Sequence, residues 1–362
     1  VYDGAAARPT VEQLLTNTSG MSGAADAAAA DRYDNTDGAL ERAARILSDV
    51  ELFAAPGQEY EYVSANYLLL GAIIEEVTGR EFDEHLRATV LDPLDMDSVI
   101  TDTEAAKRLP PGHRQYLGQA VSYTDPYDES GVSYGYMAGS AADLGRFMLA
   151  QLGDGEAGGE RILSAETVAE SHKGRVKTSN EEFGYGWSVG TLAGTGERMV
   201  WKAGATSGYH TMLVLLPERD RAIVLTQNTY SEARALQLRN AAFDAARLSI
   251  GESTGPALTP DPTLSYAPWI LAALCLPLLL SLWTTWRRAR RGTLSRSRLR
   301  FTGWALLGAG VPAALLLALP AWFEVSLLRL QLWAPDLGLC LIALSVAAFV
   351  AAGWRIGLGM RR

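Results

Sequence analysis

Three uncharged apolar runs in the last 97 residues constrain the fold of this chain more than any other feature. They cover residues 266–286, 301–323 and 337–354, with lengths of 21, 23 and 18 residues. A helix rises about 1.5 Å per residue, so about 20 apolar residues can cross the hydrocarbon core of a membrane. Three such runs in succession are rare among the buried helices of soluble proteins. We therefore expect residues 266–362 to form a domain of three transmembrane helices.

The distribution of arginines predicts the orientation of these helices. Seven arginines lie in the loop between the first two runs, and loops rich in Lys and Arg remain on the cytoplasmic side. The loop formed by residues 324–336 has only Arg329 and should lie outside, which returns the C-terminus to the cytoplasm. We expect a multi-pass protein of the cell membrane with residues 1–265 on the extracytoplasmic side.

Charge and cysteine content separate the two parts of the chain. Residues 1–265 hold 21 Lys and Arg against 39 Asp and Glu, whereas residues 266–362 hold 11 against 2. The acidic part lacks the basic surface that nucleic-acid binding requires, so we expect no nucleic acid among the partners. The apolar runs make the membrane lipid an expected partner. Cys275 and Cys340 both lie within apolar runs, so the outer domain has no disulfide framework.

The beginning of the sequence differs from what this topology requires. An exported domain needs a signal peptide, but none is recognisable and the chain starts at Val1. We therefore expect an N-terminally incomplete domain over residues 1–250, joined by a linker of Pro, Gly and Ser residues at 251–265 to the helices.

Periodicity and capping signals predict a mixed α/β domain. Thr10 and Gln13 form a capping-box pattern at the start of a short helix, and Gly79 should end a largely buried helix over residues 66–77. Further helices are expected at 137–152 and 231–248, and an antiparallel meander of strands at 199–204, 212–216 and 222–226.

Two short patterns carry residues suited to catalysis. Tyr62 and Ser64 directly precede the buried helix, and a phenol beside an ammonium group can act as a base. Lys202 lies on a strand, with Gly204 leaving room for a ligand and the Ala205 N–H able to face a substrate oxygen. Each pattern alone also fits a packed tyrosine, or an exposed lysine with a turn glycine.

Taken together, the segments resemble the serine β-lactamase and penicillin-binding-protein-like hydrolases, especially their class C β-lactamase-related, esterase-like branch. Residues 11–21, VEQLLTNTSGM, resemble the family segment LLTHTSGL, with Asn17 where histidine is usual. Residues 62–71, YVSANYLLLG, resemble its second motif, and Lys202-Ala203-Gly204 stands at its third, Lys-Thr-Gly. Shorter matches lie at residues 92–96, 137–155 and 183–187.

The resemblance implies a fold, a chemistry and roles for these residues. It implies an antiparallel sheet flanked by helices with a helical lobe, and acyl transfer on an ester, a lactam or a D-peptide without a cofactor. Tyr62 would take or relay the nucleophile's proton, with Ser64 in support. Lys202 would hold the negative end of the substrate, and Gly204 and Ala205 would form the oxyanion and substrate-binding strand. The substrate would be a small molecule or a peptide, with cell-wall peptide as one candidate.

The nucleophile motif of that family, Ser-x-x-Lys, is absent from the 362 residues. The chain alone is therefore expected to be inactive, while the full gene product would be a serine hydrolase. A non-catalytic cell-envelope receptor or sensor for peptides is the alternative, and a structural module without a ligand is a third hypothesis. The four histidines lack metal-ligand spacing, so no metal site is expected. His210 is expected in a surface loop or lining the site.

Overall fold

A computed structural model describes residues 2–124, 126–179, 181–293, 298–322 and 326–360. The chain divides into two compact units. Unit 1 comprises Val1–His113, Ser122–Tyr230 and Arg234–Thr259, and unit 2 comprises Arg114–Val121, Ser231–Ala233 and Pro260–Arg362.

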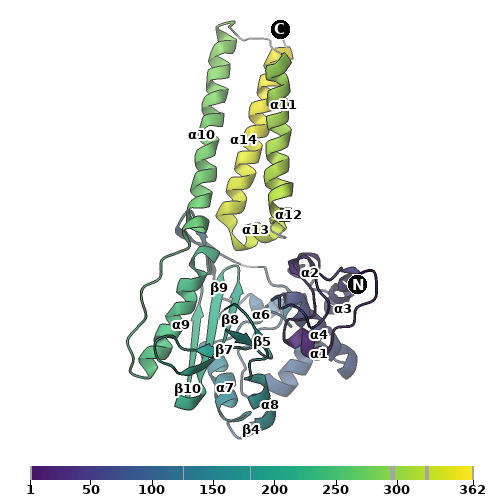
Figure 1. The fold of residues 1–362 in the computed structure, drawn as a ribbon, viewed down its shortest axis with the longest axis vertical. Helices are drawn as coiled ribbons and strands as arrows, with labels where there is room; N and C mark the ends of the chain where they lie inside the picture. The colour runs from purple at the N-terminus through teal and green to yellow at the C-terminus, as the bar shows by residue number, and fades with distance from the viewer. Residues whose placement is uncertain (1, 125, 180, 294–297, 323–325, 361–362) are drawn as a thin grey trace. The chain divides into compact units, whose positions relative to one another are not determined.

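A six-stranded antiparallel sheet organises unit 1, with the order β10-β9-β8-β7-β6-β5 (Figure 1). The predicted meander is present, because β8 pairs with β9 and β9 pairs with β10. The register places Lys202 opposite Leu213 and Gly204 opposite Thr211. The strands are β5 (Val176–Lys177), β6 (Glu182–Phe183), β7 (Ser188–Thr191), β8 (Arg198–Thr206), β9 (Tyr209–Leu216) and β10 (Arg221–Gln227).

Strand β8 is buried on both faces of this sheet. Met199 and Trp201 pack with Met212 and with residues of α9 (Ala235–Ser249) on one face. Val200, which points to the opposite face, packs with Met148 of α7 (Ala141–Leu152). The alternation of side chains along a strand therefore explains why three successive apolar residues can all be buried.

A helical lobe completes unit 1. Its core includes Leu14, Met21, Leu40 and Leu68. The helices that contribute these residues, or lie between them, are α1 (Val11–Leu15), α2 (Gly23–Ala29), α3 (Ala39–Ile46) and α4 (Ser64–Thr78). The smaller elements are η1 (Leu47–Asp49), α5 (Phe82–Leu86), η2 (Arg87–Leu91), α6 (Thr103–Ala106), η3 (Glu129–Gly131), β3 (Glu156–Ala157), β4 (Glu160–Arg161), α8 (Ala165–Ser171), η4 (Pro217–Arg219) and η5 (Glu232–Arg234). The hairpin of β1 (Gly112–Tyr116) and β2 (Gln119–Tyr123) spans the boundary between the units in sequence.

The local signals in the sequence are mostly confirmed. The capping box of Thr10 and Gln13 forms at α1, and Gly79 ends α4 in the left-handed conformation with φ of 64°. The prediction that α4 is largely buried is wrong for its second half, where Ile73 and Val77 are 38% and 79% exposed. Its all-round apolar pattern covers the core only at the N-terminal turns, where Ala65 and Leu68 are fully buried.

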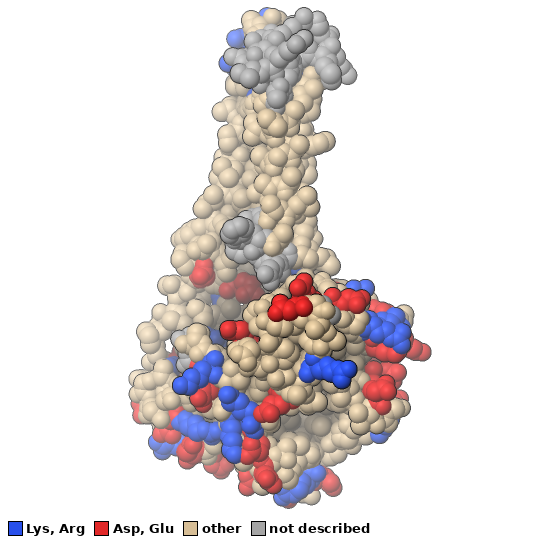
Figure 2. Space-filling view, turned by 45° about the vertical axis from the view of Figure 1, so that its right-hand side comes forward, with Lys and Arg blue, Asp and Glu red and all other residues tan. Residues whose placement is uncertain are grey.

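Unit 2 consists mainly of helices, with α14 (Pro335–Met360) packed against both α10 (Pro262–Arg290) and α11 (Arg298–Ala313). After α11 come η6 (Ala314–Ala318), α12 (Leu319–Trp322) and α13 (Leu327–Trp333). The helical part of unit 2 presents an almost uniformly uncharged surface in Figure 2, with basic atoms gathered at one end.

The number of long apolar helices differs from the prediction. Among the described residues, Pro262–Arg290 and Pro335–Gly357 are long and apolar enough to cross a membrane, whereas Gly303–Ala318 is a shorter apolar helix. Two of the three predicted helices therefore have spanning length within the described residues, and the middle one does not. Pro312 lacks the N–H of a regular helical turn, and the wider turn η6 follows it directly.

Gly20, in the segment after α1, provides a test of the packing within unit 1. Its φ is +85°, and a methyl group there would overlap the carbonyl oxygen of Ala54. We expect Gly20→Ala to lower the free energy of unfolding by about 1–3 kcal/mol, because both the left-handed backbone and the close contact become strained. Urea unfolding of the detergent-solubilised chain, followed by tryptophan fluorescence, measures this.

Gly145→Ala is the matched control for that substitution. Gly145 lies within α7, and a methyl group at this position would have no neighbouring atom within 4 Å, so alanine should stabilise by about 0.5–1 kcal/mol. Equal stability of the Gly20→Ala variant and the native chain would contradict the packing described.

Candidate active site

A direct hydrogen bond joins the two residues that the sequence motifs singled out. The Lys202 Nζ donates to the Tyr62 hydroxyl at 2.9 Å, although the residues are 140 positions apart. Tyr62 lies two residues before α4, and Lys202 lies in the middle of β8. Tyr62 is 50% exposed, so its hydroxyl remains accessible while it contacts the lysine. The helical lobe and the sheet of unit 1 thus each supply one half of the pair.

Aromatic rings surround the ammonium group of Lys202. Its Nζ lies 4.5, 5.4 and 5.9 Å from the ring centroids of Tyr62, Phe183 and Tyr67, respectively. Phe183 packs edge-on against Tyr62 at 6.1 Å. Such faces attract a cation electrostatically, and no ion pair joins Lys202 to a carboxylate in the described parts of the chain. The positive charge is therefore held in place without being neutralised by protein.

The two neighbouring tyrosines differ from Tyr62 in their surroundings. Burial, with a smaller effect of Tyr62, raises the pKa of Tyr60 to about 12. Burial also raises the pKa of Tyr67, whose hydroxyl donates to the carbonyl oxygen of Leu15 at 3.0 Å. Both phenols therefore stay protonated near neutral pH. Tyr62 is the exposed tyrosine that contacts the lysine.

Asn17 fastens the backbone on both sides of Tyr62. Its carbonyl oxygen accepts the Glu61 N–H at 3.0 Å, and its Oδ1 accepts the Val63 N–H at 3.2 Å. The Asn66 Nδ2 donates to the same Oδ1 at 2.8 Å. Asn17 is 1% exposed and has φ of 56°, a region in which Asn and His are enriched among residues other than glycine. The motif that contains Asn17 gave no sign of this contact with the Tyr62 segment.

The remaining predicted site residues lie on the same two segments. Ser64 is the first residue of α4, and its side chain makes no contact with Tyr62 or Lys202 among the described hydrogen bonds. Gly204 is exposed, and a methyl group there would make only one ordinary contact, with Thr211. Strand β7 pairs with β8 only from Arg198 to Trp201. Beyond that point, through Ala205, one edge of β8 has no partner strand in the described sheet and can offer backbone groups to a ligand.

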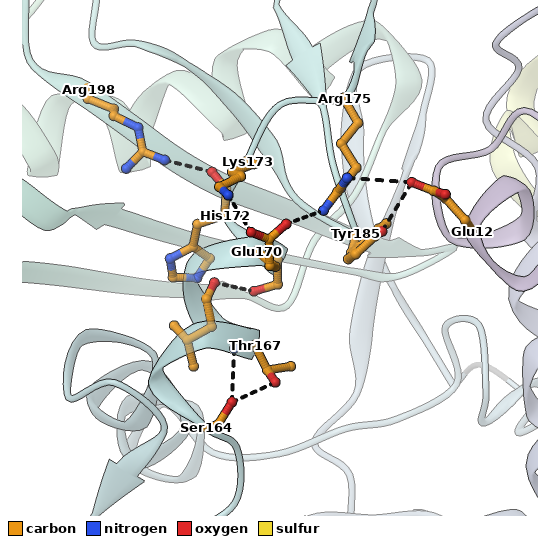
Figure 3. Close-up of polar contacts among 11 residues, drawn as sticks. Glu12, Ser164, Thr167, Glu170, His172, Lys173, Arg175, Tyr185 and Arg198 are labelled. Carbon is orange, nitrogen blue, oxygen red and sulfur yellow. Dashed lines mark hydrogen bonds and ion pairs between the residues drawn. The ribbon is translucent and has the colours of Figure 1, made fainter.

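A polar network connects α1 to the sheet beside this site (Figure 3). Glu12 accepts hydrogen bonds from Arg175 at 3.5 Å and from the Tyr185 hydroxyl at 3.2 Å, and Arg175 also donates to Glu170 at 2.6 Å. The Arg175 guanidinium lies 4.1 Å from the centre of the Tyr185 ring. The network joins residues 11–21 to residues 183–187, and both segments resemble motifs of the family named in the sequence analysis. Because Glu12 is largely exposed, its ion pair contributes little to stability.

The buried histidines have structural partners. His172 contacts Gln151 at 2.9 Å, and burial, with a smaller effect of Arg198, lowers its pKa to about 4. His210 is buried on β9 and contacts Gln227 at 2.8 Å, so its expected position in a surface loop is wrong. No group of three or more metal-ligating side chains occurs in the described residues.

The contacts of Asn17 generate a prediction about the Tyr62 segment. Asn17→Ala should lower the free energy of unfolding by about 2–4 kcal/mol, because two buried donors lose their acceptor and alanine is strained at this φ. Asn17→His is the matched variant, since an imidazole nitrogen can accept a hydrogen bond and histidine tolerates the conformation. Urea unfolding compares them, and native stability of Asn17→Ala would show that the contacts do not hold this segment.

Known proteins resemble both the sequence and the fold. Protein flp of Staphylococcus aureus strain MRSA252 is 27% identical over 233 residues, covering 64% of this chain and 45% of flp. Penicillin-binding protein 4 of Amycolatopsis lactamdurans is 32% identical over 169 residues, covering 44% of this chain and 42% of that protein. The chain thus spans less than half the length of these curated relatives.

Solved structures share the fold at lower identity. The octameric penicillin-binding protein homologue from Pyrococcus abyssi has a TM-score of 0.58 and 24% identity, covering 73% of this chain and 59% of that one. A class C β-lactamase has a TM-score of 0.52 and 16% identity, covering 65% and 68%. The model of the Beta-lactamase family matches residues 1–247. The chain, with its paired Tyr62 and Lys202, therefore belongs to the Beta-lactamase family.

Proposed function

We propose that this chain belongs to a membrane-anchored, extracytoplasmic serine hydrolase that transfers an acyl group from an ester, a lactam or a D-peptide. The observation that carries the proposal is the 2.9 Å hydrogen bond between Lys202 and Tyr62. Acyl transfer by a serine needs a base for the hydroxyl proton and positive charge beside that base. The pair supplies both, and the Beta-lactamase family match supports the assignment.

Each residue of the site has a role in the proposed reaction. Tyr62 accepts the proton from the attacking serine and returns it to the leaving group, while Lys202 stabilises the phenolate form and attracts a substrate carboxylate. The unpaired edge of β8 beyond Trp201 presents backbone N–H groups, and the Ala205 N–H is the proposed donor to the oxyanion. Ser64, at the start of α4, supports Tyr62 in this proton transfer.

The proposed reaction also needs a serine nucleophile. No Ser-x-x-Lys occurs among the 362 residues, and the chain matches only 45% of flp and 42% of Penicillin-binding protein 4. The complete protein would bring a serine within reach of the Tyr62 hydroxyl. The substrate we propose is a small ester, a lactam or a cell-wall peptide with a carboxylate that can approach Lys202.

Two features support the membrane anchor. Pro262–Arg290 and Pro335–Gly357 have the length and composition of spanning helices, and few of the side chains in the first are buried within the protein. The arginines between the first two apolar runs favour a cytoplasmic position for that loop, which leaves residues 1–265 outside the cell membrane. The middle run, shorter in the structure, is proposed to cross with its π-helical turn packed against α14.

The missing nucleophile also favours a second candidate function. A domain with the Tyr62–Lys202 pair but no acylating serine can bind an anionic peptide reversibly. Coupled to membrane helices, such a domain would act as a cell-envelope receptor. The two functions differ in whether a covalent acyl-enzyme forms.

A fluorescent penicillin and a p-nitrophenyl ester test the proposal on the longest in-frame protein and on the 362-residue chain. We expect the longer protein to be labelled covalently and to turn over the ester. Tyr62→Phe should reduce its turnover by about 10²–10⁴-fold, because the base is lost. Lys202→Met should reduce it comparably, while Tyr60→Phe, which changes a neighbouring half-buried phenol, should leave it within a few-fold.

The same assay separates the two candidate functions. Reversible penicillin binding by both proteins, without labelling or turnover, would reject the hydrolase and favour the receptor. A longer frame that reaches a stop codon before any Ser-x-x-Lys would also reject the hydrolase.

A further inference from the structure

The helical part of unit 2 concentrates positive charge at one end. Helix α10 finishes with Arg287, Arg288 and Arg290 in its last turn, and Arg355 lies near the C-terminal end of α14. The only carboxylates after residue 261 are Glu324 and Asp336, and Asp336 begins α14 at its other end. The charge of these four arginines, named here the arginine cluster, is therefore not balanced by a nearby acidic side chain of the same helices.

Arg355 uses only part of its guanidinium to join the helices. Its Nε donates to the Thr285 hydroxyl at 2.8 Å, and its Nη2 donates to the Ser281 carbonyl oxygen at 2.8 Å and to the Ser281 hydroxyl. The group stacks on Trp304 of α11 at 3.5 Å from the ring centroid. Its Nη1 donates to no acceptor among the described residues, and the like charge of Arg288 acts on the same guanidinium.

Two further arginines lie over indole rings. Arg287 lies 4.6 Å from the ring centroid of Trp283, and Arg290 lies 4.1 Å from that of Trp286. A guanidinium stacked on a ring keeps its N–H edges free for in-plane acceptors. No ion pair joins these arginines to a carboxylate in the described residues. Their donors are oriented and available.

The surface beside the cluster is apolar. Trp283 and Trp286 are 50% and 39% exposed, and Leu276, Leu279 and Leu280 in the preceding turns of α10 are 54–65% exposed. A ligand that satisfies both features has an anionic head and a long apolar tail. Phosphate oxygens match the paired N–H donors of guanidinium groups.

We propose that the arginine cluster binds the phosphate of an anionic phospholipid, whose acyl chains cover the exposed leucines of α10. This inference rests on the membrane placement in the proposed function, which puts the cluster at the cytoplasmic leaflet. It assigns the helices a lipid-recognition site in addition to anchoring. Indole rings at this depth also suit the membrane interface.

The test measures the thermal unfolding of the detergent-solubilised full chain with increasing phosphatidylglycerol or phosphatidylcholine. We expect phosphatidylglycerol to raise the unfolding temperature and phosphatidylcholine to have little effect. The triple variant Arg287→Gln, Arg288→Gln and Arg290→Gln should weaken the phosphatidylglycerol effect about fivefold for each arginine, about 100-fold in all. Within the described residues, no side-chain hydrogen bond joins these three arginines to another helix, so the variant should fold normally.

Two further variants sharpen the test. Arg329→Gln, in α13 near the start of α14, is the matched control and should leave the lipid response unchanged. Arg355→Gln should weaken the response and also lower the unfolding temperature without lipid, because it removes contacts to α10. An equal response to both lipids, or equal weakening by Arg329→Gln, would overturn the proposal.

Additional arms distinguish a lipid headgroup from a soluble anion and test the membrane placement. Inorganic phosphate that produces the same shift as phosphatidylglycerol at the same concentration would assign the cluster to a soluble anion and reject the lipid. Retention of the chain in membranes washed with alkaline carbonate tests the placement separately. A retained chain without lipid preference rejects only this inference, whereas a chain released by the wash rejects both the membrane placement and the lipid site. Penicillin labelling is unaffected by either outcome.

Discussion

The burial of β8 on both faces is the constraint on which the geometry of the site depends. Met199 and Trp201 pack toward α9, and Val200 packs toward α7, so this strand cannot slide or rotate without exposing apolar surface. Its pairing with β9 continues through Thr206. Lys202 therefore projects from a rigid position, and the exposed Gly204 follows at a fixed distance along the strand. A more loosely packed edge strand would not hold an ammonium group in one place.

Two independent sets of contacts hold the Tyr62–Lys202 pair in position. Asn17 holds the backbone on either side of Tyr62, and the rings of Phe183 and Tyr67 surround the lysine. A long lysine side chain loses considerable rotamer freedom when it is held in one geometry. Here aromatic faces offset part of that cost without neutralising the charge. This arrangement suits the role proposed for Lys202, which is to influence a phenol and also to attract an anionic substrate.

In unit 2, the unbalanced charge lies on arginines at one end of the helices. A helix-rich apolar segment that ends in several arginines needs counter-charges, and its own sequence offers none at that end. Contacts with Trp283, Trp286 and Trp304 position the guanidinium groups, and no carboxylate pairs with them in the described parts of the chain. Gly308 shows how closely the helices pack, because a methyl group there would overlap Ala352 of α14. Small residues thus permit the close approach of α11 and α14.

Local features of this protein followed from short-range rules. The Thr10 capping box, the left-handed Gly79 and the three-stranded meander depend on residues a few positions apart, and these predictions are confirmed. Errors arose where neighbours in space decide the outcome. Val77 is 79% exposed although it is apolar, and His210 is buried because the sheet places it beside Gln227. The middle apolar run has the composition of a span, but among the described residues its apolar helix, Gly303–Ala318, is shorter than the other two.

The sequence by itself determined the two-part character of the chain, its family and the residue types of the site, because composition, periodicity and motif order are properties of the chain alone. Only the tertiary structure decided that Tyr62 and Lys202 touch, that Asn17 supports the first, and that Arg355 bridges three helices. These contacts join residues 46 to 140 positions apart. They depend on how the lobe packs on the sheet and how the helices pack together, which no local pattern of residues specifies.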